Sequence, residues 1–142
     1  MKQFLIVSFL LAISTQMIAQ ETTTVYINNK KAAQTVIKPD QTKASLLIKK
    51  SKYKNYKSII ITVSGEYIGS EVYKRSLEIS GENSNIIDET KNKPGHFDIS
   101  KTGAVKILLA GKTVSLYLLL NPSNPLMTMP SRRVFLGDIM MK

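Results

Sequence analysis

The chain has 142 residues, a formal net charge of +10 and no cysteine. A chain of this length can bury one hydrophobic core, and its charge favours acidic or polyanionic partners. The lack of cysteine excludes disulfides, thiol nucleophiles, CxxC redox sites and thiolate metal sites.

The N-terminal residues have the pattern of a secretory signal peptide. Lys2 supplies a basic start and precedes an apolar run over residues 4–13 in which Ser8 is the one polar residue, and Ala19 offers the small residue of a cleavage site. The run is too short to cross a hydrocarbon layer of ~30 Å, so we prefer cleavage to an uncleaved anchor or a buried first helix. We expect residues 1–19 to be a cleaved signal peptide. Residues 20–142 then form one domain in the periplasm or at the cell surface, with no transmembrane segment.

The remaining residues predict short β-strands separated by turn signals such as Asn-Asn, Pro-Asp and Ser-Gly. We expect strands at residues 22–27, 34–37, 44–48, 58–63, 72–79, 96–100, 104–110, 113–120 and 134–141. Residues 82–95 are expected to form a long surface loop. About seven to nine short strands at this spacing predict an all-β chain. The expected fold is a single antiparallel β-sandwich, Ig-like, or a small barrel.

Two of the expected strands have a defined orientation. Alternation along residues 72–79 places Tyr73, Leu77 and Ile79 on one face of the strand. Residues 113–120 are apolar on both faces, which predicts a central strand with cover on each side.

The segment KKSKYKNYK, residues 49–57, holds five lysines and two tyrosines. Over residues 22–65 nine lysines face one acid, Asp40, whereas ten basic residues face eight acids from residue 66 onward. Such a one-sided field attracts polyanions, which in the cell envelope are lipopolysaccharide, acidic glycans or acidic loops of proteins, not nucleic acid. The predicted contact residues are Lys49, Lys50, Lys52, Tyr53, Lys54, Tyr56 and Lys57, with Lys30, Lys31 and Lys43 on the same basic side.

A different role for these lysines is to prevent aggregation. They separate two very apolar strands, and charges beside such strands block edge-to-edge pairing. Tyr53 and Tyr56 are three positions apart, so in an extended chain they point to opposite faces and form no flat aromatic platform.

Catalytic motifs are sparse. His96 is the only histidine, and Asp98 would share its face of a strand, where a carboxylate can orient an imidazole. A hydrolase also needs an activated nucleophile, but the chain has no GxSxG turn, no Gly-rich phosphate loop and no HExxH. We therefore expect no enzymatic activity, no catalytic residue and no cofactor.

Met127 and Met129 lie in the proline-flanked stretch PLMTMP. Two thioethers at positions i and i+2 share one side of an extended segment, and thioethers favour Cu(I). His96 could add an imidazole, and Met140 or Met141 could approach from the last strand. In these few residues the chain is similar to small periplasmic copper-binding proteins, which use Met and His on β-barrels. Alternatively, the methionines fill an irregular part of the core.

These features together predict an exported, non-catalytic binding or accessory module of the bacterial cell envelope. It would act through its basic side or through the apolar loop around Leu126, where exposed Leu and Met side chains would form a docking patch for a protein. The alternative is a periplasmic Cu(I)-binding protein that uses Met127 and Met129, with copper as its cofactor.

Overall fold

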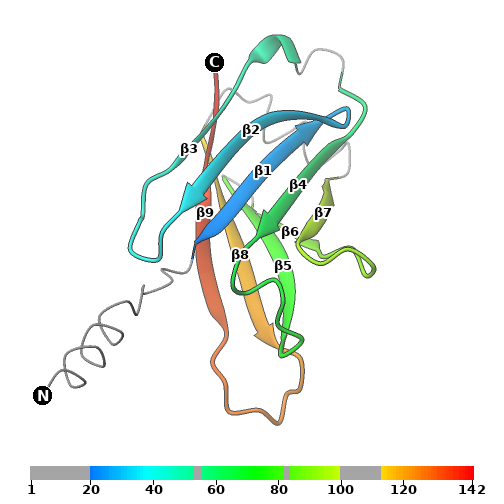
Figure 1. Ribbon diagram of the computed structural model, residues 1–142, viewed down its shortest axis with the longest axis vertical. Coiled ribbons are helices and arrows are strands. Elements are labelled where there is room, and N and C mark those ends of the chain that lie inside the picture. Colours follow the sequence, from blue (N-terminus) through cyan, green and yellow to red (C-terminus); the bar gives the residue numbers. More distant parts are fainter. Residues whose placement is uncertain (1–19, 53–55, 82–83, 100–112) are drawn as a thin grey trace, which may run out of the picture.

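The computed structural model describes residues 20–52, 56–81, 84–99 and 113–142 of the chain (Figure 1). These residues form nine β-strands and one short 3₁₀ helix, which confirms the predicted all-β class. In chain order the elements are β1 (Glu21–Ile27), β2 (Lys30–Ile37), β3 (Ser45–Ile48), η2 (Lys50–Lys52), β4 (Ile59–Ser64), β5 (Tyr73–Ser80), β6 (Asn85–Asp88), β7 (His96–Ile99), β8 (Val114–Pro122) and β9 (Arg132–Met141). The described part of the chain contains no helix with the length and hydropathy that a membrane span requires.

Two predictions fall on residues that the structure does not describe. The signal peptide at residues 1–19 and the strand expected at residues 104–110 lie outside the described residues. Both stay predictions.

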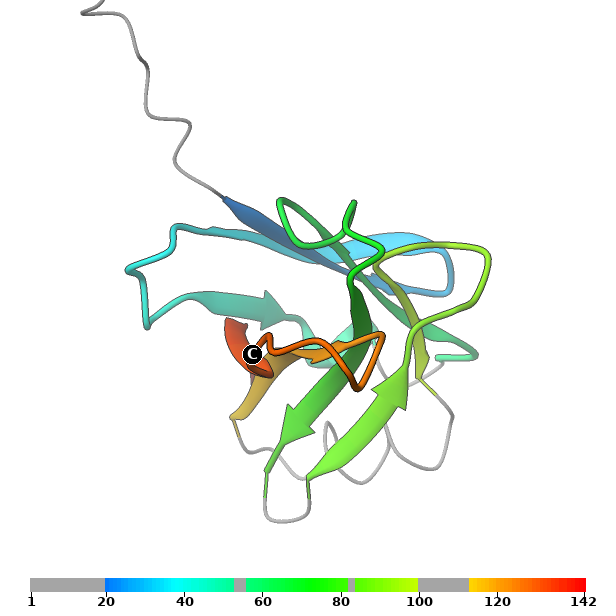
Figure 2. The same cartoon turned by 90° about the horizontal axis from the view of Figure 1, so that it is seen from below.

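The strands are arranged in two sheets. A four-stranded sheet has the order β2-β1-β4-β7, and a five-stranded sheet has the order β3-β9-β8-β5-β6. In Figure 2 the strands β1 and β2 of the four-stranded sheet lie above β3 of the five-stranded sheet. The hydrogen bonds of each sheet stay within it, so the two sheets are joined by side-chain packing and by the loops that cross between them.

Strand β3 departs from the predicted antiparallel arrangement. It pairs with β9 in parallel, from Ser45 opposite Asp138 to Ile48 opposite Met141, whereas the other described pairs are antiparallel. The loop at residues 38–44 carries the chain from one sheet to the other, so no hairpin sets the direction of β3. Its partner is the last strand of the chain, and the local pattern of β3 does not specify that partner.

Both sheets turn an apolar face toward one common core. The largest fully buried side chains are Val25, Ile61 and Phe97 of the four-stranded sheet and Leu46, Ile48, Leu77, Leu116, Leu118, Leu120, Leu136 and Ile139 of the five-stranded sheet. Burying one side chain of this kind contributes about 1.5–3 kcal/mol, so the alternation of apolar residues decides which face of each strand turns inward. The predicted inner face of β5 is confirmed, because Tyr73, Leu77 and Ile79 are all buried.

Strand β8 is central in its sheet, as predicted, but its two faces differ. The inner side chains, among them Leu116 and Leu118, are 0% exposed, whereas Tyr117 on the outer face is only half-buried. The guanidinium of Arg133 lies 3.5 Å from the centre of the Tyr117 ring, and the centroid of Phe135 lies 5.6 Å from that of Tyr117. The predicted cover on each side is therefore complete on the inner face and partial on the outer face, where it comes from side chains of the neighbouring strand β9.

A β-bulge in β9 changes which side chains of its C-terminal half point toward the core. Leu116 lies opposite Gly137 and Tyr117 lies opposite Phe135, so Leu136 and Gly137 together add one residue to the ladder. Gly137 has a φ of +131°, a backbone conformation that residues other than glycine rarely adopt. The extra residue lets Leu136 and Ile139 both be buried while Asp138 accepts a hydrogen bond from Ser115 at 2.6 Å.

Residues 82–95, expected to be one long loop, contain the edge strand β6. It pairs with β5 from Ser76 opposite Asp88 to Ile79 opposite Asn85. Ile87 packs against the core, whereas Ile86 is 56% exposed. Strand β6 has four residues, and only Ile87 packs against the core. Such a short sequence pattern cannot be distinguished from that of a loop unless the partner strand is known.

The β1–β2 hairpin turns at Asn28 and Asn29. Both have positive φ, 52° and 62°, as the central residues of a type I′ turn require, and Asn tolerates this conformation. The side-chain oxygen of Asn28 accepts hydrogen bonds from the backbone N–H of Lys57 at 2.6 Å and of Ser58 at 3.2 Å. The hairpin tip and the start of β4 are therefore held together.

Candidate functional site

Exposed lysines gather at one end of the molecule, the upper end in Figure 1. The tip of the β1–β2 hairpin, the residues after β3, the start of β4 and the C-terminus all lie there (Figure 1). This basic end consists of Lys30, Lys31, Lys49, Lys50, Lys57 and Lys142.

Hydrogen bonds of the backbone fix the segments of the basic end relative to one another. The N–H of Lys50 donates to the carbonyl of Lys142 at 2.8 Å, and the N–H of Lys142 donates to the carbonyl of Ile48 at 2.9 Å. The bond from Lys57 to Asn28 adds the hairpin tip. The lysines therefore extend from an ordered backbone, although their side chains reach into solvent.

No acidic residue occurs in the segments that carry the basic end, residues 28–31, 48–50, 56–58 and 142. In the described part of the chain, the ion pairs are Arg75–Glu89 and Arg133–Glu78, both at 2.8 Å, and His96–Asp98 at 3.4 Å, and none includes a lysine of the basic end. Uncompensated charges on one surface add up to a local positive potential. The basic end is the described surface that best fits an anionic partner.

Four predicted contact residues of the segment 49–57 are not part of the basic end as defined above. Lys52 is the last residue of η2, and Tyr53 and Lys54 lie outside the described residues. Tyr56 is half-buried and packs against the core, so only part of its ring is open to a partner.

Lys43 does not join the basic end. It lies in the loop at residues 38–44, which connects the end of β2 to the start of β3, whereas Lys30 and Lys49 lie at the opposite ends of these strands. Because β2 and β3 run in opposite directions, the loop between them is at the far end of these two strands, away from the basic end (Figure 1). The prediction that Lys43 belongs to the same basic side was wrong for this reason.

His96 and Asp98 share the outer face of β7, as predicted for a strand. His96 Nε2 lies 3.4 Å from Asp98 Oδ1, and His96 lines a shallow hollow of about 240 Å³ with Tyr26, Ile60 and Thr62, among others. No group of three or more His, Cys, Asp or Glu in the described residues could hold a metal ion. The absence of enzymatic activity stays a prediction.

Leu126, Met127 and Met129 lie in the loop between β8 and β9. They are 89%, 42% and 38% exposed. His96 lies on the other sheet, and Met140 is at the far end of β9, whose ten residues span about 30 Å. The expected approach of Met140 or Met141 was therefore wrong, and copper binding stays a prediction for the two thioethers of the loop alone.

A second site, which the sequence patterns did not single out, lies around Glu21. This residue begins β1 and, like Thr23, Val25 and Ile27, points toward the inner face. It is 5% exposed, and neither carboxylate oxygen has a hydrogen-bond partner of normal geometry among the described residues. Extending the alternation of β1 by one residue toward the N-terminus was the signal that would have found it.

The turn after β4 closes over the Glu21 carboxylate. A Cβ at Gly65 would overlap the carboxylate, so only glycine allows this approach. Burial raises the pKa of Glu21, and the negative charge of Glu66 raises it further, although the nearby backbone N–H groups of Tyr67 and Glu66 act in the opposite direction. The carboxyl group therefore holds its proton more tightly than an ordinary glutamate does.

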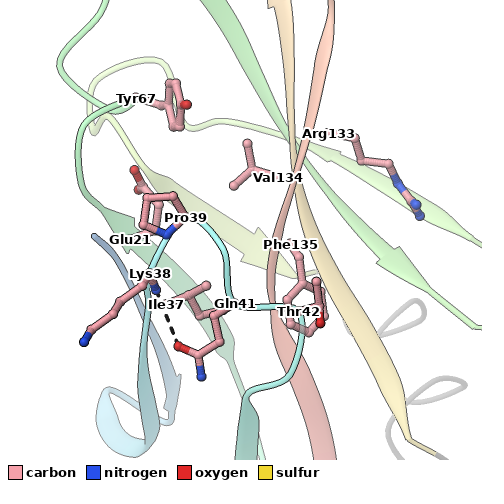
Figure 3. A pocket seen from close by; sticks show the side chains of 10 residues that line it. All are labelled: Glu21, Ile37, Lys38, Pro39, Gln41, Thr42, Tyr67, Arg133, Val134 and Phe135. Carbon is pink, nitrogen blue, oxygen red and sulfur yellow. Dashed lines mark hydrogen bonds between the residues drawn. The ribbon is translucent and has the colours of Figure 1, made fainter. Parts of the chain in front are cut away.

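A cavity of about 260 Å³ lies beside Glu21 (Figure 3). Its walls come from the start of β1, the end of β2 with the loop that follows, Tyr67, and residues 133–135 of β9. Ile37 lies opposite Glu21 in the β1–β2 ladder, which is why the carboxylate and the loop after β2 meet.

Comparison of the chain with protein-family models, with curated proteins and with solved structures finds no match. What the protein does is therefore inferred from its own residues and geometry, with the basic end and the Glu21 cavity as its two candidate sites.

Proposed function

We propose that the chain is an exported, non-catalytic binding module of the bacterial cell envelope that contacts a polyanionic partner through its basic end. The observation that carries this proposal is the gathering of lysines from four separate segments at one end, in segments without an acidic residue. The partner class is lipopolysaccharide or an acidic glycan, met in the periplasm or at the cell surface. The fold that we infer is a β-sandwich, because two separately hydrogen-bonded sheets favour a sandwich over a closed barrel.

Binding of this kind is driven by the release of counterions from the polyanion. Each lysine that neutralises a phosphate or sulfate displaces a condensed cation, so affinity falls as salt concentration rises. Lysine is a strongly hydrated point charge on a flexible stem, which suits tolerant recognition of many anionic groups rather than of one geometry. The function that we propose for this surface is binding without catalysis.

The proposal is tested by binding to immobilised lipopolysaccharide over a range of salt concentrations. We expect retention at low salt that falls steeply toward physiological salt. The variant Lys30→Gln, Lys31→Gln, Lys57→Gln should bind more weakly, by about 1 kcal/mol for each lysine in contact, and should show a shallower salt dependence.

The matched control removes the same charge elsewhere. The variant Lys43→Gln, Lys91→Gln, Lys93→Gln has the same net charge, but none of its changes lies in the basic end. Equal losses in the two variants would mean that net charge alone governs binding, and salt-independent retention or none at low salt would overturn the proposal.

The loop around Leu126 is a second candidate contact surface, for a protein partner. Leu126 is 89% exposed, and its neighbours Pro125 and Met127 are exposed as well, so the loop presents apolar surface that a protein partner would cover. A photo-crosslinking residue at position 126 should give a defined adduct in envelope preparations, whereas one at position 91 should not. A smear of adducts at both positions would dismiss a specific docking patch.

A further inference from the structure

The parallel ladder of β3 and β9 continues into the basic end, past the pair Ile48 and Met141. The N–H of Lys142 donates to the carbonyl of Ile48, and the N–H of Lys50 donates to the carbonyl of Lys142. In a parallel ladder a residue is bonded to the residues before and after the one that it faces. Lys49 therefore lies opposite Lys142.

Two exposed apolar side chains lie in the outward-facing row before these lysines. Leu47 is opposite Met140, and the two are 51% and 40% exposed. Because side chains alternate along a strand, each of them shares its face with the lysine two positions later. The rows are two residues apart, about 7 Å along the strands. We call Leu47, Met140, Lys49 and Lys142 the amphiphilic corner.

The two lysines of the amphiphilic corner repel each other. Neighbouring strands are about 4.8 Å apart, and like charges directly opposite one another are unfavourable. Asp138 is on the same face of β9, but the apolar row separates it from the lysines and it accepts a hydrogen bond from Ser115. An anionic group between the two ammonium groups would remove the repulsion.

A lipid headgroup with its hydrocarbon chain matches both rows of the corner. A phosphate has several acceptor oxygens, so that one group accepts charge-assisted hydrogen bonds from both lysines. The apolar stem of lysine lies along hydrocarbon while its charge stays at the level of the headgroups. A soluble polyanion would satisfy the lysines but would leave Leu47 and Met140 in water.

We propose that the amphiphilic corner binds the surface of an anionic lipid bilayer, with a lipid phosphate between Lys49 and Lys142 and with Leu47 and Met140 against the hydrocarbon. The inference rests on the proposed function, because both lysines belong to the basic end, and it names the lipid phosphate as their anion. Interfacial binding of this kind combines buried apolar area with attraction to anionic lipids.

The test measures co-sedimentation of the chain, purified from the cell envelope, with vesicles. Vesicles of equal parts phosphatidylglycerol and phosphatidylcholine should bind it more tightly than vesicles of phosphatidylcholine alone. Leu47→Thr, Met140→Thr should weaken binding to the mixed vesicles by about tenfold, because it removes the apolar contact and retains residues that favour strands. The same variant should bind soluble dextran sulfate within about twofold of wild type, since that polyanion meets only the lysines.

The matched control replaces exposed apolar residues of other strands. Val36 and Ile86 are 45% and 56% exposed, on β2 and β6, and Val36→Thr, Ile86→Thr should change neither vesicle nor dextran sulfate binding by more than about twofold. All variants have the same N-terminal residues, so vesicle binding by those residues would be equal in all of them.

The lysine variant tests the other half of the corner. Lys49→Gln, Lys142→Gln should weaken binding to the mixed vesicles by about 25-fold, since each lysine near an anionic bilayer contributes a factor of about five. It should weaken binding to dextran sulfate as well.

A second measurement uses the wild-type chain. Lipids with a nitroxide on the acyl chain should broaden the methyl NMR resonance of Met140. The resonances of Met127 and Met129, in the loop at the other end of β9, should broaden less and serve as internal controls.

Unchanged vesicle binding by either corner variant overturns the inference, and unchanged binding by the lysine variant assigns these lysines to preventing aggregation. Stronger broadening of Met127 and Met129 than of Met140 also overturns it. The proposed function survives such a result if retention of the wild type on dextran sulfate and lipopolysaccharide still falls with salt. A chain that neither polyanion retains at low salt overturns the proposed function and this inference together.

Discussion

At the start of β1, the carboxylate of Glu21 faces the protein interior although it stands beside the N-terminal end of a strand. Alternation along β1 decides this, since Thr23, Val25 and Ile27 share its side. Gly65 lets the turn after β4 close over it. A single residue thus combines burial, a raised pKa and a neighbouring cavity, which is a frequent combination at functional sites.

Replacing Glu21 by Gln should change the pH dependence of stability. The pKa of Glu21 is raised in the folded state, so the folded chain holds this proton over a pH range in which the unfolded chain has lost it. Stability therefore falls as pH rises from the unfolded value, 4.5, to the raised folded value, and stays low above it. Glu21→Gln should be more stable than the wild type by about 1 kcal/mol at neutral pH, with the gain vanishing below the unfolded pKa.

Urea unfolding at a series of pH values measures this difference. The variant Glu66→Gln, which removes a neighbouring carboxylate, should show a smaller effect of the same sign. A constant difference between wild type and Glu21→Gln at all pH values would contradict the prediction.

At the scale of the element, the bulge in β9 allows Leu136 and Ile139 of one strand both to be buried. Without the extra residue, the alternation that buries Leu136 would turn Asp138 inward and Ile139 outward. Gly137 provides the backbone conformation, with φ at +131°. The neighbouring chain is also close, since a Cβ there would lie 3.3 Å from Thr35 Cγ2 and 3.4 Å from the Ala44 carbonyl oxygen.

Gly137→Ala should therefore destabilise the fold. The positive φ strains any residue with a Cβ by about 1–3 kcal/mol, and the tight contacts add to this cost. Chemical denaturation gives the free energy of unfolding. Gly69→Ala is the control, since no atom lies within 4 Å of the added Cβ there, and it should stay within about 0.5 kcal/mol of wild type. Equal stabilities of the two variants would mean that the bulge adapts to alanine.

The parallel pairing of β3 with β9 and the edge strand β6 belong to the same scale. Their residues have ordinary β patterns, but their partners are set by contacts between distant parts of the chain. Hairpin turns with their own signals, such as Asn28-Asn29, were predictable because the turn and both strands lie within a short segment.

On the scale of the whole molecule, both sheets depend on one core. β8 contributes Val114, Leu116, Leu118 and Leu120 to it from the centre of the five-stranded sheet. Loss of volume there affects contacts with both layers, since close-packed interiors collapse only partly around a cavity.

Leu118→Ala should cost about 2–5 kcal/mol of the free energy of unfolding, because Leu118 is 0% exposed. Its neighbour Leu119 has the same chemistry on the half-buried outer face, and Leu119→Ala should cost roughly 1 kcal/mol or less. Thermal or urea unfolding of the pair measures the contrast. Similar costs for both variants would mean that the outer face of β8 is covered as completely as the inner one.

The whole molecule also has two unlike ends. The basic end draws lysines from four segments, whereas the Glu21 cavity lies between loops that carry Asp40 and Glu66. Lys43 shows how the ends separate, since it is near the lysine-rich segment in sequence but lies at the far end of β2 and β3. The basic end and the surroundings of Glu21 can therefore be altered independently, and the lysine and Glu21 variants test them one at a time.

Local information was enough for the all-β class, for the inner face of β5 and for the lysine-rich segment, because alternation, turn residues and charge act over a few neighbouring positions. The partner of β3, the strand β6, the hydrogen bonds that join Lys142 to Lys50 and Ile48, and the burial of Glu21 were decided only in three dimensions. Each depends on which distant segments pack together, and that choice is made by the shared core and the loops that cross between the sheets.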